Sequence, residues 1–218
     1  MSQNIQNKWN SWITKFENSV MELLEDRKFF RTFLEIIKSN PDLPENNHFL
    51  IWVWKNYIIS TLMSVRRLVD THYRCISLCK LLIEIKNNPR ILSRERYVSL
   101  SKNISLSDDD DDYINICFDE LVGADREYID PRTVKRDIQL LKKKYKKLKY
   151  YINKRIAHAD KNKITRLPTI NDLDDCIDYL EELVLKYSAI FHAYSFDGLT
   201  PRLQYRWKNI FRIPWMAS

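Results

Sequence analysis

Apolar side chains recur at three- and four-residue steps through most of this chain, the spacing that puts them on one face of an α-helix. The first such stretch runs from about Ile5 to Ile37, and the second from about Phe49 to Val69. Pro41 and Pro44 stand between them and predict a break. The second stretch is the richer in tryptophan and tyrosine, so we expect it to lie at the centre of the core.

Three shorter helices are predicted in the middle of the chain. One runs from about Arg74 to Lys86 and stops before Pro89. The next is capped by Ser93, because Glu95 and Arg96 follow in its first turn. The third spans about residues 114–122.

Two longer apolar stripes follow. The first begins behind Asp130-Pro131, an N-cap residue followed by proline at the first helical position, and keeps its rhythm to about Ala157. The second begins near residues 169–172 and continues to about Tyr194. We expect one unbroken helix from each stripe, and we expect the two helices to pack as an antiparallel pair.

Composition narrows the fold class. The chain of 218 residues has only two glycines. Glycine-rich phosphate loops, dinucleotide-binding fingerprints and two-residue hairpins all need the positive φ of glycine, so the sequence argues against each of them. A 44% apolar content at this length suits one sizeable core. The prediction is an all-α helical protein folded as a single domain over residues 1–218.

Two segments are expected outside the core. Residues 105–112 end in five consecutive aspartates, which repel one another and predict a solvated insert. This insert is either a plain spacer or a contact for the basic helix. Residues 199–218 form a basic and aromatic C-terminal segment, which is expected to dock on the core or on a partner.

The four cysteines form no CxxC pair, which predicts a reducing, cytoplasmic setting. We see neither a cleavable signal peptide nor an apolar run near the roughly 20 residues that span a bilayer, and we expect no membrane partner. His72, Cys75 and Cys79 share a helical face, but a fourth ligand is not evident. Small buried cysteines are the simpler interpretation, so neither a metal nor another cofactor is expected.

Positive charge is concentrated in one segment. Residues 132–155 contain eleven basic residues and one acid, Asp137, a local charge of +10, whereas the rest of the chain sums to −3. Such a helix can neutralise several phosphates, and Lys146, Lys147 and Lys149 are the candidates for contact with an RNA backbone. A charged face that only keeps the protein soluble is the alternative.

The end of this basic segment, residues 153–160, holds the candidate chemistry. His158 follows Lys154 and Arg155 by about one helical turn. A histidine titrates near neutral pH and neighbouring cations can hold a phosphate, so the group has the components for attack on a phosphodiester. A solvated helix end, whose last carbonyls attract cations, is the competing interpretation.

Taken together, the basic helix, the phrase Asn-Lys-Arg-Ile-Ala-His-Ala-Asp and the following amphipathic helix resemble the HEPN superfamily of helical proteins, many of which are nucleases. Other short motifs look like its bacterial abortive-infection U-type branch. These motifs are Arg66-Arg67-Leu68-Val69-Asp70, Ile76-Ser77-Leu78, Leu81-Leu82, Asn88-Pro89 and Ser93-Arg94-Glu95. The similarity extends to about Tyr194.

The resemblance implies a bundle of about four or five main helices, with short accessory helices, that forms a homodimer with a composite, metal-independent RNase site. It also implies a role in defence against phage. Active members carry an arginine, a polar residue and then a histidine, with four to six residues between arginine and histidine. His158 matches the histidine, and Asn153 matches the polar residue that commonly follows the arginine.

The catalytic arginine is missing from this pattern. The best alignment puts Ile152 in its place, and Ile152 continues the apolar stripe, where a cation would be buried. Lys154 or Arg155 could supply the charge from a shifted position. Asp160 could hold the histidine tautomer or could simply be a turn residue. Arg66 and Asp70 could support the site or form ordinary one-turn ion pairs.

Three hypotheses remain open from the sequence. The first is an RNase of bacterial defence that uses the ribose 2′-hydroxyl as nucleophile, with His158 moving the proton and Lys154 or Arg155 stabilising the anionic oxygens. The second is a catalytically silent helical module that dimerises or binds nucleic acid or another protein. The third is a purely structural helical protein.

Overall fold

The computed structural model describes residues 2–40, 47–104, 111–157, 167–194, 198–199 and 206–212, with side chains throughout except at 2–3, 104 and 155–157. Within these ranges the chain is helical and forms no strand, as the sequence predicts. The elements are α1 (Ser2–Lys38), α2 (His48–Val69), α3 (Leu78–Asn87), η1 (Pro89–Ile91), α4 (Arg94–Ile104), α5 (Asp111–Val122), α6 (Pro131–Tyr151), η2 (Ile152–Ala157), α7 (Ile170–His192) and η3 (Trp207–Arg212).

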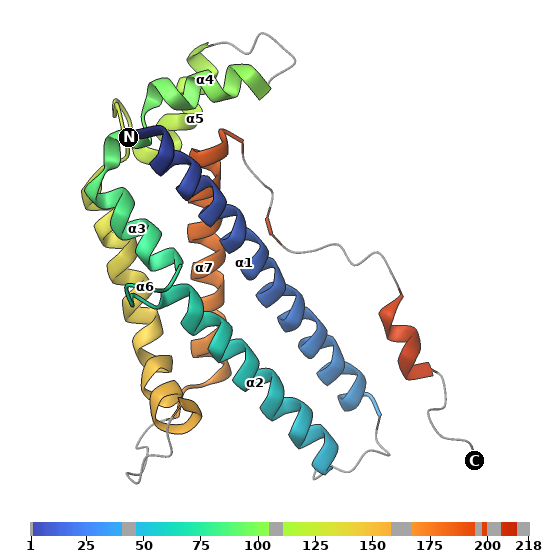
Figure 1. Ribbon diagram of the computed structural model, residues 1–218. Coiled ribbons are helices and arrows are strands. Elements are labelled where there is room, and N and C mark those ends of the chain that lie inside the picture. The colour runs from blue at the N-terminus through green and yellow to red at the C-terminus, as the bar shows by residue number, and fades with distance from the viewer. Residues whose placement is uncertain are drawn as a thin grey trace.

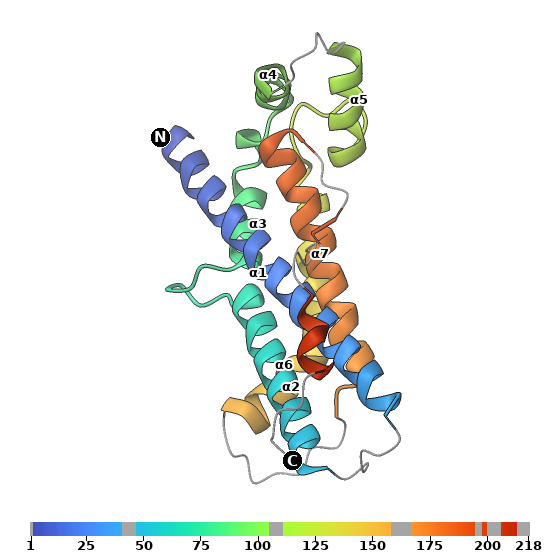
Figure 2. The same ribbon diagram turned by 90° about the vertical axis from the view of Figure 1, so that its right-hand side faces the viewer.

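Helices α1, α3, α6 and α7 form the body of the molecule, and α4 and α5 lie at the end where the chain begins (Figure 1). Helix α7 packs against both α1 and α6, and α3 packs along α6. The expected antiparallel pair of α6 and α7 is confirmed. At the opposite end, the last turns of α1 and the first turns of α2 project together (Figure 2).

Helix α7 supplies the centre of the core. Its start is fixed by Thr169, whose hydroxyl accepts the backbone N–H of Asp172 at 3.1 Å, while the Asp172 carboxylate accepts the backbone N–H of Thr169 at 3.1 Å. This reciprocal capping satisfies two donors that a helix start otherwise leaves without partners. More than half of the helix is buried, including Leu173, Cys176, Ile177, Leu180, Val184, Tyr187 and Phe191.

Helix α1 is joined to α7 by apolar packing at one end and by ion pairs at the other. Trp9 is fully buried, its ring lies edge-on to Phe191 at 6.2 Å, and its indole N–H donates to Glu84 at 2.8 Å. Further along, Arg31 pairs with Asp174 at 2.8 Å, and Arg27 is only 13% exposed where it contacts the same carboxylate. These contacts run the length of α1 and fix it against the core.

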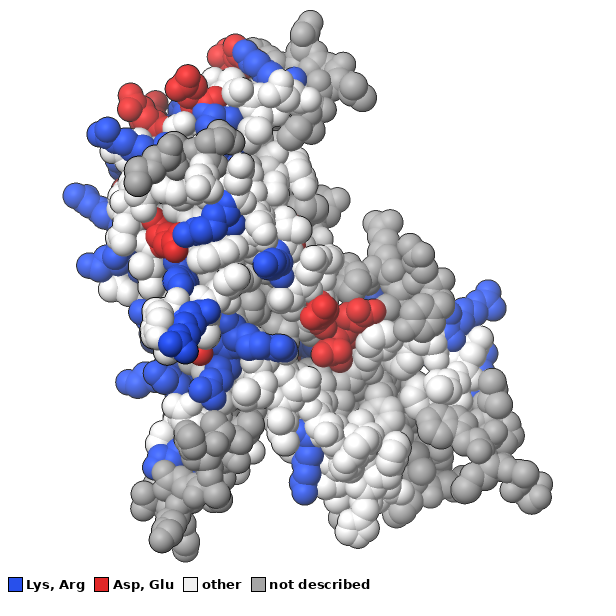
Figure 3. All heavy atoms as spheres, in the orientation of Figure 1, with Lys and Arg blue, Asp and Glu red and all other residues white. Residues whose placement is uncertain are grey.

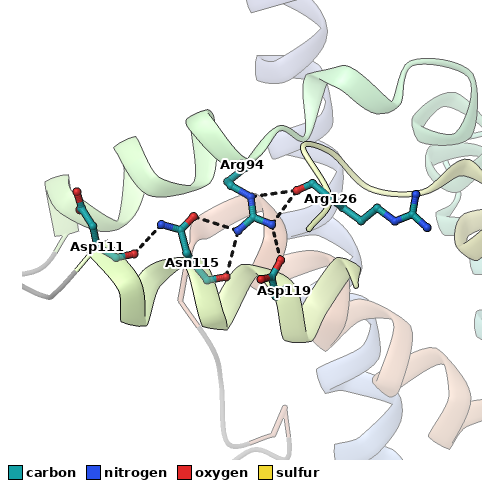
Figure 4. Close-up of polar contacts among 5 residues, drawn as sticks. All are labelled: Arg94, Asp111, Asn115, Asp119 and Arg126. Atoms are coloured by element: carbon teal, nitrogen blue, oxygen red, sulfur yellow. Dashed lines mark hydrogen bonds and ion pairs between the residues drawn. The ribbon is translucent and has the colours of Figure 1, made fainter. Parts of the chain in front are cut away.

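Arg94 joins α4, α5 and the loop that follows α5 (Figure 4). Its guanidinium pairs with Asp119, donates to the side-chain oxygen of Asn115 at 3.0 Å and donates to the carbonyl of Arg126 at 2.8 Å. The Phe118 ring lies 4.8 Å from the same group. A single first-turn arginine therefore fixes three segments at this end of the molecule.

Two expected helix boundaries are corrected by these elements. Helix α3 begins at Leu78 and not near Arg74, because Ser77 adopts an extended conformation and caps the helix through the backbone N–H of Lys80. Asp111 opens α5, so the expected acidic insert 105–112 is partly helical; residues 105–110 lie outside the described residues. An acidic first turn is favoured by the helix dipole.

The largest correction concerns α2. Only its second half is buried, at Thr61, Leu62, Val65, Leu68 and Val69, and its aromatic first half is largely exposed. Aromatic composition alone was a misleading guide to the centre of the core, because α2 extends beyond the end of the body. The C-terminal segment 199–218 contacts α1 through η3. The ring of Trp207 lies edge-on to that of Phe29, with the ring centres 4.8 Å apart.

Candidate nucleic-acid interface

Helix α6 carries the basic segment on a defined face. Asp130 caps its start by accepting the backbone N–H of Arg132 at 2.7 Å, and Pro131 occupies the first position. The inward face is apolar, with Val134, Ile138, Leu141, Tyr145 and Leu148 buried against α3 and α7. The opposite face is exposed and carries Arg132, Lys135, Arg136, Lys142, Lys143, Lys146, Lys147 and Lys149.

This cationic face is not neutralised by the acid in its own helix. Asp137 points inward, is 9% exposed, and accepts from Lys186 at 2.7 Å and from the Tyr187 hydroxyl at 2.9 Å. Burial, together with the nearby Asp137 carboxylate, raises the pKa of Tyr187 well above its ordinary value, so the hydroxyl stays a donor. Asp137 therefore does not reduce the positive charge of the outward surface.

The three lysines predicted to contact RNA do not share one environment. Lys147 forms an ion pair with Asp172 at 2.6 Å, and this pairing, with the hydrogen bonds from Thr169, lowers the pKa of Asp172 to about 2. Lys146 and Lys149 are exposed and make no ion pair with a carboxylate in the described part of the chain. Blue side chains cover one edge of the molecule, over α3 and α6 (Figure 3).

The end of the basic helix differs from the unbroken α-helix predicted to Ala157. Residues 152–157 are wound as a π-helix, η2, which is wider than an α-helix. Ile152 is fully buried, as its place in the apolar stripe predicts, while Asn153 and Lys154 are partly exposed. Short π-helical segments occur frequently at functional sites, and this one lies directly before the candidate histidine.

Of the residues predicted to form the catalytic group, the structure describes the side chains of Asn153 and Lys154. His158 and Asp160 lie outside the described residues, and the side chain of Arg155 is not described. The Lys154 ammonium lies 5.7 Å from the centre of the Tyr150 ring. The α-helical winding that the sequence predicts for this segment is not the winding of residues 152–157.

The proposed supporting residues lie on the packed side of α6. Asp70 ends α2 with its backbone N–H bonded to the carbonyl of Arg66 at 2.9 Å, its carboxylate accepts the backbone N–H of His72 at 2.8 Å, and its carbonyl accepts from the Ser77 hydroxyl. Burial raises the pKa of Tyr145 above its ordinary value, and the positive charge of the nearby Arg66 opposes this only in part. Asp70 thus organises the connection between α2 and α3.

Sequence reasoning missed a concavity of about 1150 Å³ between α4 and the loop after α5. Arg90, Arg94, Lys102 and Tyr128 line it. No periodic signal could have placed these residues together, because the fold brings Tyr128 of the loop after α5 to the same hollow as Arg94 and Lys102 of α4. Across the described residues no three His, Cys, Asp or Glu side chains gather as a metal site, and no helix there is both long and apolar enough to cross a membrane.

Comparison with known families decides the relationship. Residues 6–208 match the HEPN_AbiU2 family, described as AbiU2. The chain belongs to this family. The resemblance to the HEPN superfamily and its abortive-infection U-type branch is thereby confirmed, and the match covers every α-helix from α2 to α7 and nearly all of α1. No curated protein and no solved structure matches the chain.

Proposed function

We propose that this HEPN protein of the abortive-infection type binds RNA along the exposed cationic face of α6 and cuts it near His158 without a metal ion. The observation that carries the proposal is the cationic face itself. Its charge is exposed, its one acid is turned inward, and it leads into η2 immediately before the histidine. Phosphates held on this face would direct an RNA strand toward the end of the helix.

The proposed reaction is attack of the ribose 2′-hydroxyl on the neighbouring phosphate. His158 takes or gives the proton, and Lys154 or Arg155 stabilises the anionic oxygens in place of the missing arginine. Asn153, half-buried in η2, orients the phosphate or the imidazole. The homodimer that the family resemblance implies would bring two such helix ends together. RNA would then bind along the exposed cationic face of α6.

One observation favours a catalytically silent binding module as the second candidate. Ile152 occupies the position of the expected arginine and is fully buried. An arginine at this position would have to lose its hydration inside the core, so this helix cannot present the standard group there without repacking. RNA binding without cleavage, or binding of a protein partner, would then be the function of the same face.

The decisive experiment separates cleavage from binding. Wild type and His158→Ala are incubated with end-labelled RNA in chelator, and the 3′ ends of the products are identified. Cyclic phosphate ends produced by the wild type alone support the RNase. Cleavage by neither protein, with equal RNA binding by both, contradicts catalysis and supports the silent module.

RNA binding is tested by comparing Lys147, which pairs with Asp172, with lysines of the cationic face that make no ion pair within the described residues. The double variant Lys143→Ala/Lys146→Ala is expected to weaken RNA binding and to reduce the slope of log affinity against log salt by about 1.4, since each phosphate contact on a single strand contributes about 0.7. Lys147→Ala is the matched control, because this lysine already pairs with Asp172 and should change the slope less. Equal effects per lysine removed would contradict a selective cationic face.

A further inference from the structure

The first half of α2 carries large apolar side chains that are exposed. Phe49 is 55% exposed, Trp52 59% and Trp54 47%, and Ile51 and Ile59 are exposed as well. At 100° per residue these five side chains point to several sides of the helix and not to one stripe. Large apolar side chains on several sides of a helix are normally covered on those sides. Within the described residues α1 covers one side, where Phe30 stacks on Tyr57 at 3.8 Å, and Phe49, Trp52 and Trp54 stay exposed.

The C-terminal helix η3 extends the same surface. It is attached to α1 through Trp207 on Phe29 and through Phe211, whose ring centre lies 6.1 Å from that of Phe33. Trp207 and Trp52 line the same hollow of about 500 Å³ between α1 and α2. Ile210 is 51% exposed. We call the exposed apolar residues of the two helices the tip surface: Phe49, Ile51, Trp52, Trp54, Ile59, Ile210 and Phe211.

The two segments that carry the tip surface bring charge of one sign, and Asp26 of α1 is the acid that lines the adjoining hollow. Residues 47–60 and 206–212 contain no aspartate or glutamate. They contain four exposed cations, Lys55, Arg206, Lys208 and Arg212. Figure 3 shows mostly uncharged surface at the end of the molecule where α2 begins. An apolar, tryptophan-rich surface edged by cations is complementary to a layer with an apolar interior and an anionic face.

We propose that the tip surface docks this protein on an anionic phospholipid bilayer, with the tryptophans at the headgroup level and the cations on the phosphates. Tryptophan is favoured at such interfaces because its ring is apolar and its N–H is polar. The expectation of no membrane partner rests on the lack of a spanning segment and does not address docking on the surface of a bilayer.

Two other occupants fit the tip surface less well. In a symmetric pair of copies the patch meets itself, so Lys55 and the cations of η3 would face like charges. Single-stranded RNA matches the charge, but Ile51, Ile59 and Ile210 offer neither a ring for base stacking nor a polar group for a base edge. A bilayer matches the charge, the aliphatic residues and the exposure of α2 on several sides.

The test is co-sedimentation of the full chain with vesicles of phosphatidylcholine alone and with vesicles of equal parts phosphatidylcholine and phosphatidylglycerol. We expect binding to the anionic vesicles to be stronger on the order of a hundredfold, since each of the four cations contributes about fivefold at most before screening. Trp52→Ser/Trp54→Ser should lower the partition coefficient about tenfold or more. Both side chains are exposed, so this variant should fold normally.

Tyr113→Ser is the matched control, because Tyr113 is 62% exposed on α5, at the other end of the molecule. It should bind vesicles as wild type does. Lys143→Ala/Lys146→Ala should also bind vesicles normally, even if RNA binding is lost, so the two proposals can fail separately. Equal vesicle binding by wild type and Trp52→Ser/Trp54→Ser overturns the proposal. Absence of wild-type binding to the vesicles also overturns it. An effect of Trp52→Ser/Trp54→Ser on the oligomeric state or on RNA affinity would then point to one of the other two occupants.

Discussion

Replacing Asp172 by asparagine removes one charge at the junction of α6 and α7 while keeping the shape of the side chain. Asp172 is 8% exposed and serves two purposes: it pairs with Lys147 of α6 and completes the cap of α7 with Thr169. Asparagine can still accept the backbone N–H of Thr169, but it cannot form the ion pair. The variant therefore isolates the electrostatic contribution of this contact.

The magnitude follows from the pKa of Asp172, which falls from 3.8 to about 2 in the folded protein. A difference of this size corresponds to about 2.4 kcal/mol at most. Lys147 is 54% exposed, so water and salt screen the pair, and we expect Asp172→Asn to lower the free energy of unfolding by about 1–1.5 kcal/mol at neutral pH. Asp172→Ala should lower it by about 1 kcal/mol more, because the cap is lost too.

The assay is urea unfolding followed by circular dichroism, repeated at several pH values. Because the pKa of Asp172 is lower in the folded than in the unfolded chain, its contribution is present above pH 3.8 and is lost as the pH falls toward 2. The difference between wild type and Asp172→Asn should shrink over that interval. Asp175→Asn, at an exposed position of the same helix, is the control. A pH-independent difference, or equal effects of the two variants, would refute the reasoning.

Three further substitutions test the fold and the site. Arg94→Ala should lower the free energy of unfolding by about 2–3 kcal/mol in thermal or urea unfolding, since it leaves Asp119 without its partner, whereas Arg90→Ala should cost less than about 1 kcal/mol; similar losses would contradict the role of Arg94. Asp137→Ala should cost about 3 kcal/mol by the same assay, with a neutral result counting against the Lys186 and Tyr187 contacts. Ile152→Arg should destabilise the protein by about 3 kcal/mol or more and raise no RNase activity, so a stable and more active variant would show that the arginine can reach the site.

Helical periodicity predicted most of the fold, because burial along α6, α7 and α1 up to Phe30 repeats with nearly every turn. The stripe from Val134 to Leu148 is buried at every expected position, and Ile152 follows it. The same logic failed for the first half of α2, because periodicity reports which residues are apolar and not whether another element reaches them. Aromatic residues there were taken for core and are exposed instead.

The candidate site was predictable only in part. The concentration of charge on α6 can be counted from the sequence. The ion pair that neutralises Lys147 cannot be predicted from it, because its partner Asp172 lies 25 residues further along the chain. The winding of η2 was not predictable, because apolar spacing near Ile152 and Ile156 fits an α-helix equally well. Arg94 shows the same limit, since its partners Asp119 and Arg126 are distant in sequence.

The π-helix at the end of α6 also bears on how relatives of this chain should be aligned. A π-helical turn holds about one residue more than an α-helical turn, so it is equivalent to an insertion of one residue. A deletion of one residue within 152–157 would restore α-helical winding while changing little the direction in which the helix leaves this segment, because the wider turn already absorbs one residue. A count of residues between the motif positions is then a poor measure of whether two side chains meet. A one-residue gap at this point of an alignment therefore records a change of winding from π to α, and a varying number of residues before the motif histidine is compatible with one facing of the helix.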